Sequence, residues 1–132
     1  MSFYEAMKAA ALLGAGGGNG NNLLTSTIEV GTIDSEGVDT PNSNRLRTKD
    51  ASALSESGDY SLFFTADDTL YAWAFKYSAD GTFIERIGYD WQRAPLTFTA
   101  EAGQQFRFIF NSDSGSVALS PSDLHNLMLV KN

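Results

Sequence analysis

The side chains best suited to holding a ligand lie in one short run, from Tyr89 through Asp90, Trp91 and Gln92 to Arg93. Tyrosine and tryptophan rings can stack on sugar rings, and the neighbouring acid, amide and guanidinium groups can give directional hydrogen bonds. Because the run follows a predicted strand, we expect a shallow glycan-binding site in a loop. In the alternative interpretation, Trp91 closes one end of the core or packs in a subunit interface.

The sequence offers little for catalysis. His125 is the only histidine, and no serine stands in a nucleophile-elbow setting, so a Ser-His-Asp triad is not expected. One histidine and no cysteine leave too few ligands for the usual zinc or iron centres. The acidic pair Asp67-Asp68 does not match a calcium-binding EF-hand, and the spacing of the loop carboxylates gives no support to a glycosidase. We therefore expect no enzymatic activity, no metal and no cofactor.

The charge balance argues against nucleic acids and membrane surfaces as partners. With 16 acidic and 9 basic side chains, the 132-residue chain has a formal net charge of −7. Binding to phosphate groups requires clustered Lys and Arg, and here these residues are scattered. Arg45 and Arg47 alternate on one predicted strand, where pairing with acids is favoured over an anionic ligand. The apolar run 9–13 is far shorter than the roughly 20 residues that cross a bilayer, so we expect no membrane insertion.

Two aromatic segments, 70–77 and 106–110, show the period-two alternation of half-buried strands. The residues assigned to the core on this basis are Trp73, Phe75, Phe106 and Phe108. Asp80-Gly81 lies between one of these strands and the next, and predicts a hairpin with a type I′ turn, which needs positive φ at both central residues.

Further strands are predicted at 28–33, 45–48, 60–65, 82–88, 96–100 and 127–131, with a weak candidate at 117–119. Residues 34–44 predict a surface loop. Ser120, Pro121 and Asp123 predict a single helical turn with Ser120 as its cap. Many short strands separated by turns predict an all-β domain, an antiparallel jelly-roll-like β-sandwich over residues 23–132.

The first 22 residues differ from the rest. Ser2 and Glu5 have the spacing of a capping box, which predicts a short helix over residues 1–13. A helix of this length is marginal alone in water, so we interpret it as an anchor for a partner surface, with a frayed terminus as the alternative. The expected anchor residues are Phe3, Tyr4, Met7, Ala10 and Leu12. Residues 14–22, rich in glycine and asparagine, predict a flexible tether.

Several segments carry a further pattern. These are Ile28-Glu29, Arg45-Leu46-Arg47-Thr48, Asp80-Gly81-Thr82-Phe83, Thr97-Phe98-Thr99, Phe106-Arg107-Phe108 and Ser120-Pro121-Ser122-Asp123. Together they resemble a β-sandwich module common in tail, baseplate and head-fibre proteins of tailed phages, and the likeness covers about residues 22–132. The N-terminal Tyr4-Glu5-Ala6-Met7-Lys8 segment, followed by a glycine run, is similar to the capsid-anchoring end of phage head fibre or decoration proteins.

The resemblance implies a structural protein at the virion surface. Its N-terminus would bind the major capsid protein or another virion protein, and its sandwich would be displayed and adhere weakly to host-surface glycans. Because virion appendages commonly follow particle symmetry, we also expect a homotrimer. The alternative is a tail or baseplate host-recognition module that binds carbohydrate. A third reading is an accessory carbohydrate-binding domain or a small glycan hydrolase.

Overall fold

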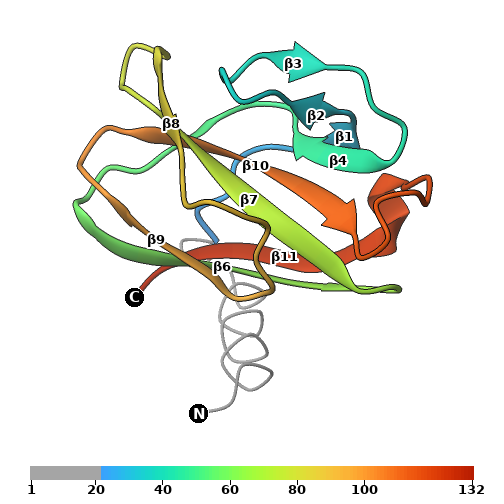
Figure 1. Cartoon of the computed structure of the whole chain (residues 1–132). Helices are drawn as coiled ribbons and strands as arrows, with labels where there is room; N and C mark the ends of the chain where they lie inside the picture. The colour runs from blue at the N-terminus through green and yellow to red at the C-terminus, as the bar shows by residue number, and fades with distance from the viewer. Residues whose placement is uncertain (1–21) are drawn as a thin grey trace.

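The computed structural model of the protein describes residues 22–132, so the predicted anchor helix and all but the last residue of the predicted tether lie outside the described residues. The described chain is all-β with antiparallel sheets, which confirms this much of the predicted fold class (Figure 1). The strands are β1 (Ile28–Val30), β2 (Thr32–Ile33), β3 (Asp39–Thr40), β4 (Arg45–Thr48), β5 (Ser52–Ala53), β6 (Gly58–Ala66), β7 (Leu70–Tyr77), β8 (Phe83–Arg86), β9 (Leu96–Ala100), β10 (Gln105–Ser112) and β11 (Leu124–Lys131).

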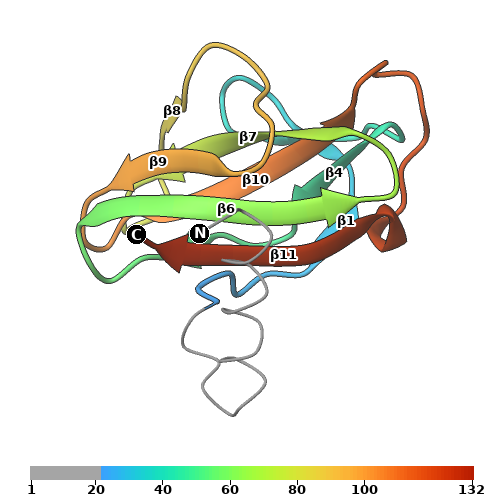
Figure 2. The same cartoon turned by 90° about the horizontal axis from the view of Figure 1, so that it is seen from below.

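Two sheets form the body of the described part. The larger has the strand order β1-β4-β10-β7-β8, with β5 also paired to β10, and the smaller has the order β11-β6-β9. Figure 2 shows β11, β6 and β9 side by side in front of the larger sheet. A separate two-stranded ribbon, β2-β3, completes the structure.

The inner core lies between the two sheets. Phe106, Phe108 and Phe110 alternate along β10 and are fully buried on this side. From the smaller sheet, Leu62 and Leu129 join the same cluster. The small side chains of β7, Ala72 and Ala74, leave room for these rings. The alternation of β10 thus supplies the bulk of the core, as a strand with one strongly apolar face should.

The aromatic residues of β7 form a second cluster on the opposite face of the larger sheet. This outer cluster consists of Ile33, Trp73, Phe75, Tyr77 and Ile109, with Phe83 and Trp91 partly buried against it. The prediction that Trp73, Phe75, Phe106 and Phe108 are buried is confirmed. They do not share one core, however, because neighbouring strand residues with opposite side-chain directions separate them onto two faces.

The hairpin predicted at Asp80-Gly81 is present, since β7 pairs antiparallel with β8. The predicted type I′ turn is wrong. Gly81 has φ +88°, but Asp80 is not among the described residues with positive φ, and the Gly81 N–H donates to the Ser78 carbonyl at 3.0 Å. This matches a three-residue loop that ends in a left-handed glycine. Hydrogen bonds from Ser78 and Thr82 stabilise the Asp80 carboxylate and lower its pKa.

Most other predicted elements are confirmed, and the differences have local causes. Ser120 caps the 3₁₀ turn η2 (Pro121–Asp123) with a complete capping box. The predicted strand 28–33 is divided at Gly31, where a Cβ atom would lie 2.7 Å from the Arg47 guanidinium. The predicted loop 34–44 contains β3, which pairs with β2. Residues 117–119 form no strand.

Candidate functional site

The predicted ligand-binding run lies in the connection between β8 and β9, and its five residues have different environments. Asp90 and Trp91 line a surface hollow. Arg93 stacks beside that hollow on the ring of Tyr71, with 5.6 Å between guanidinium carbon and ring centroid. Tyr89 is fully exposed, at 102%. Gln92 bonds through its backbone to Ala72, which fixes the connection against β7.

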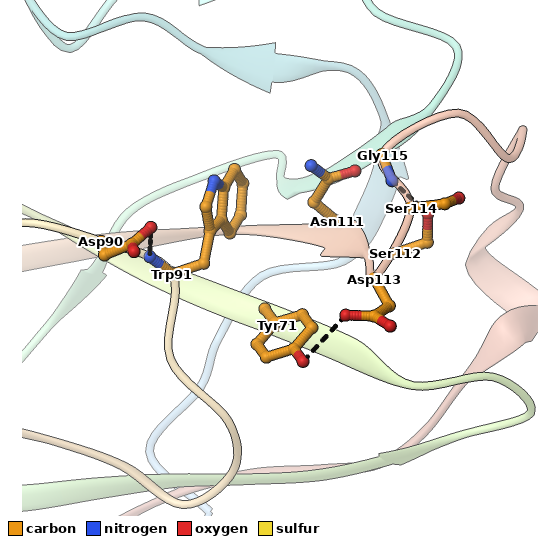
Figure 3. Close-up of a pocket in the computed structure, with 8 residues that line it drawn as sticks. All are labelled: Tyr71, Asp90, Trp91, Asn111, Ser112, Asp113, Ser114 and Gly115. Atoms are coloured by element: carbon orange, nitrogen blue, oxygen red, sulfur yellow. Dashed lines mark hydrogen bonds between the residues drawn. The ribbon is translucent and has the colours of Figure 1, made fainter.

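The hollow has a volume of about 400 Å³ and is open to solvent. Its lining comes from three places in the chain: β7, the β8–β9 connection, and the end of β10 with the turn that follows. The lining residues are Tyr71, Asp90, Trp91, Asn111, Ser112, Asp113, Ser114 and Gly115. Figure 3 shows Trp91 and Asn111 on opposite sides, with Tyr71 directed toward Asp113.

Packing holds Trp91 in place. Its ring meets Trp73 edge-on with 5.4 Å between centroids, and the Arg45 guanidinium carbon lies 5.0 Å from its centroid. Trp73 is itself fixed, because its indole N–H donates to the Ile87 carbonyl at 2.8 Å and Arg86 stacks on it at 3.9 Å. Cation–π contacts of this kind orient rings as well as stabilise them. Trp91 is therefore presented to solvent as a half-buried, positioned ring.

A chain of hydrogen bonds fixes the second ring. The Arg93 guanidinium donates to the Tyr71 hydroxyl at 3.3 Å, and that hydroxyl donates to the Asp113 carboxylate at 3.0 Å. The hydrogen bond with Tyr71 raises the pKa of Arg93, whose guanidinium, like that of any arginine, is positively charged at physiological pH. Tyr71 is thus held at one end of the hollow by a charged group on each side.

The remaining polar groups supply hydrogen-bonding capacity. One Asp90 oxygen accepts from the Trp91 backbone N–H at 2.8 Å. The Asn111 Oδ1 atom is the buried side-chain oxygen or nitrogen that has no hydrogen-bond partner within residues 22–132. Buried polar atoms are nearly always paired, and a ligand in the hollow would supply a partner once the Asn111 amide turned toward it.

The turn after β10 closes one side of the hollow. Gly115 has φ +72°, and its N–H donates to the Ser112 carbonyl at 3.1 Å. A Cβ atom at Gly115 would sit 3.6 Å from Asn111 Nδ2. That distance is an ordinary contact, so the positive φ is the reason why glycine suits this turn.

Tyr71, Asn111 and Asp113 were missed by the sequence interpretation of the site. Register explains why they gather there: Asn111 of β10 is paired with Tyr71 of β7 on one side and with Arg45 of β4 on the other. The polar run that follows an aromatic strand at 112–115 was the available signal, since loop residues positioned by a rigid sheet are common binding residues.

Three other features bear on catalysis, metal binding and membrane insertion. His125 Nε2 and Asp67 Oδ1 are 2.9 Å apart, and both side chains are largely exposed. Within residues 22–132, no cluster of three or more His, Cys, Asp and Glu side chains could hold a metal ion. In the same range no helix has the length and apolar character needed to cross a membrane.

Comparisons of the chain with protein-family models, with curated proteins and with solved structures each return no match.

Proposed function

We propose that this protein is a non-enzymatic virion surface protein, a head fibre or capsid decoration, that displays a β-sandwich and binds glycans at the hollow beside Trp91. The observation that carries the glycan part is the pairing of two positioned rings, Trp91 and Tyr71, with the polar groups of Asp90, Asp113 and Asn111. Rings flanked by hydrogen-bonding groups suit sugars, which have both apolar C–H faces and hydroxyl edges. The virion part rests on the resemblance to phage modules.

The strand order supports a jelly-roll assignment for the displayed domain. In such a fold two four-stranded sheets face each other, and the first and last strands are neighbours. The run β4-β10-β7-β8 matches one such sheet, to which β1 and β5 are added, and β11-β6-β9 match three strands of the other. The start of the described chain forms no strand but lies beside β11, where the Leu23 N–H donates to the Leu129 carbonyl at 2.7 Å.

The placement of the hollow favours display. Asn22 is held at the smaller sheet, where its Oδ1 accepts from the Leu129 N–H at 3.0 Å. Trp91 packs against the outer cluster, and Tyr71 shares the face of β7 that carries Trp73, so both lie across the larger sheet from the inner core. A domain attached through the residues before Asn22 would therefore present the hollow away from its attachment.

Each site should bind weakly. The hollow is shallow and open, so a sugar would bury little surface in it. Many copies on one particle, or three in a homotrimer, would convert weak single contacts into stable adhesion. A monomer in solution, together with separate copies on the virion, would contradict the trimer.

Glycan binding can be tested on a printed array with the full-length protein, followed by titration of the best glycan. Trp91→Ala should abolish binding, because it removes one of the two rings. Tyr89→Ala is the matched control: its ring lies two residues away, fully exposed and outside the hollow, so binding should be retained. Absence of any glycan signal from multivalent full-length protein, or unchanged binding by Trp91→Ala, would contradict the proposal.

Attachment can be tested on the particle. Electron microscopy of virions labelled through this chain should place it on the head. A chain lacking residues 1–21 should remain folded and fail to join the particle. Labelling at the tail would favour the baseplate alternative, and normal incorporation of the shortened chain would reject the anchor.

A further inference from the structure

Negative charges line the hollow, and positive charges lie beside it. The negative charges, Asp90 and Asp113, are among its lining residues. The positive charges, Arg45 and Arg93, lie against the faces of the two rings. This separation determines what kind of sugar the hollow can accept.

The carboxylates provide free acceptors. One oxygen of Asp90 accepts from the Trp91 N–H, and one oxygen of Asp113 accepts from the Tyr71 hydroxyl. Within residues 22–132 no donor is assigned to the second oxygen of either carboxylate. An ionised carboxylate can only accept hydrogen bonds, and both residues are exposed, so a donor such as a sugar hydroxyl can take the place of water on each. A uronate, sialate, sulfate or phosphate group would bring like charge to the same position and be repelled.

The guanidinium groups disfavour the opposite charge. Exposed aromatic rings normally attract cations, including ammonium ligands. In this protein the attraction is already used, because Arg45 stacks at 5.0 Å from the Trp91 centroid and Arg93 at 5.6 Å from that of Tyr71. A protonated amino sugar on these rings would meet two fixed positive charges.

Asn111 favours a group that can donate. Its buried Oδ1 has no donor among the described residues, whereas the amide can donate and accept once it turns toward a ligand. A hydroxyl group offers both functions without a charge. The same applies to the N-acetyl amide of a hexosamine.

From these observations we propose that the hollow selects electrically neutral, hydroxyl-rich sugar units, and discriminates against both anionic and protonated amino sugars. This inference rests on the proposed glycan-binding function and deepens it. The carboxylates repel an anionic group that enters the lining, and the arginines repel a cationic group that stacks on the rings.

The test uses full-length protein on an array that carries neutral, sialylated, sulfated, phosphorylated and free-amine glycans. Signals confined to neutral glycans would support the inference. Signals dominated by charged glycans would overturn it and leave the glycan-binding function standing. No signal on any class would remove the glycan-binding function and the inference with it.

Charge variants sharpen the test. Asp90→Asn combined with Asp113→Asn should raise binding to anionic glycans relative to neutral ones, since both repelling charges are gone. Arg45→Gln should raise binding to free-amine glycans such as chitosan oligosaccharides relative to N-acetylated chitin oligosaccharides. Asp80→Asn is the matched control, because Asp80 lies in the β7–β8 turn outside the hollow and should leave the selectivity unchanged. If the double variant keeps the wild-type preference, the carboxylates do not set selectivity and the inference fails.

Discussion

The inner core and the outer cluster are built on the same two strands, β7 and β10, and differ in how they are held together. The inner core is made of aliphatic and aromatic side chains packed between two sheets. The outer cluster is covered by a short ribbon, a hairpin strand and a connection, with arginines placed among its rings. One face of the larger sheet thus supplies stability by burial, and the other presents rings in fixed positions.

Polar contacts close the outer cluster where a second sheet is missing. Arg107 donates to the Thr48 carbonyl at 2.6 Å and to Asp39 of β3 at 2.5 Å. Arg47 donates to the carbonyls of Thr32 and Thr40 at 3.0 and 3.2 Å. These bonds hold the β2–β3 ribbon over the rings. Directional contacts of this kind fix geometry with less apolar burial, which suits a region that must stay partly exposed.

The largest expected effect separates the two regions by stability. Phe108→Ala should lower the free energy of unfolding by about 3–5 kcal/mol, because it leaves a cavity in the inner core. Phe83→Ala, at the half-buried margin of the outer cluster, should cost clearly less. Denaturant unfolding of both variants measures the difference. Equal losses would show that the two regions contribute alike.

The next largest effect is expected from the hydrogen bonds that hold the β2–β3 ribbon over the outer cluster. Arg107→Met keeps the length and apolar stem but leaves the Thr48 carbonyl and Asp39 without their donor, at a cost of about 1–3 kcal/mol. Lys76→Met is the control, since the Lys76 ammonium pairs with the largely exposed Glu85 carboxylate at 3.5 Å, and exposed ion pairs contribute little. Thermal unfolding compares the two. A loss for Arg107→Met no larger than for Lys76→Met would contradict the role of the arginine.

A comparison of two glycine variants separates the cost of backbone strain from an effect on the shape of the hollow. Gly115→Ala and Gly81→Ala both place a side chain at positive φ and should each cost about 1–2 kcal/mol. A Cβ atom at Gly115 would contact the Asn111 amide, whereas one at Gly81 would meet nothing within 4 Å. Glycan titration should therefore show weaker binding for Gly115→Ala alone. Equal binding by the two variants would indicate that the turn does not shape the site.

The smallest expected effect is a loss of folding stability at high pH. It can be measured for one tyrosine of each region. Burial raises the pKa of Tyr60 in the inner core and of Tyr77 in the outer cluster. Above about pH 10 the unfolded chain loses these protons before the folded chain does, so stability falls as pH rises. The loss for each tyrosine reaches at most about 1.4 kcal/mol at pH 11. Tyr60→Phe and Tyr77→Phe should each flatten the decline, and an unchanged slope would contradict the assignment for that residue.

The sequence predicted where the strands lie better than it predicted which face of each strand packs against the other sheet. Alternation located β7 and β10 because large side chains recur at every second position. It did not decide which face of β7 meets the other sheet, since Ala72 and Ala74 are apolar as well as Trp73 and Phe75. A strand covered on both faces has no polar side to break this ambiguity. Only the packing of large rings against small alanines in three dimensions resolves it.

The sequence interpretation named some of the residues that line the hollow and missed others. Asp90 and Trp91 were found because they are adjacent in the chain and in a connection. Tyr71, Asn111 and Asp113 come from other elements, and strand register brings them to the same place. Register follows from the pairing of whole strands, so short-range patterns do not reveal it. Gln92, by contrast, was assigned to the site from adjacency, and its backbone is what contacts β7.

The central claim is that the outer face of the larger sheet contains the ligand site. Its most direct test is two-dimensional NMR of the isotopically labelled full-length protein during titration with a neutral N-acetylglucosamine oligosaccharide, or with the best neutral glycan from the array. Chemical-shift changes should concentrate at Tyr71, Trp91, Asn111 and Gly115, with little change along β6, β9 and β11. Changes centred on the smaller sheet, or none at saturating ligand, would contradict the account.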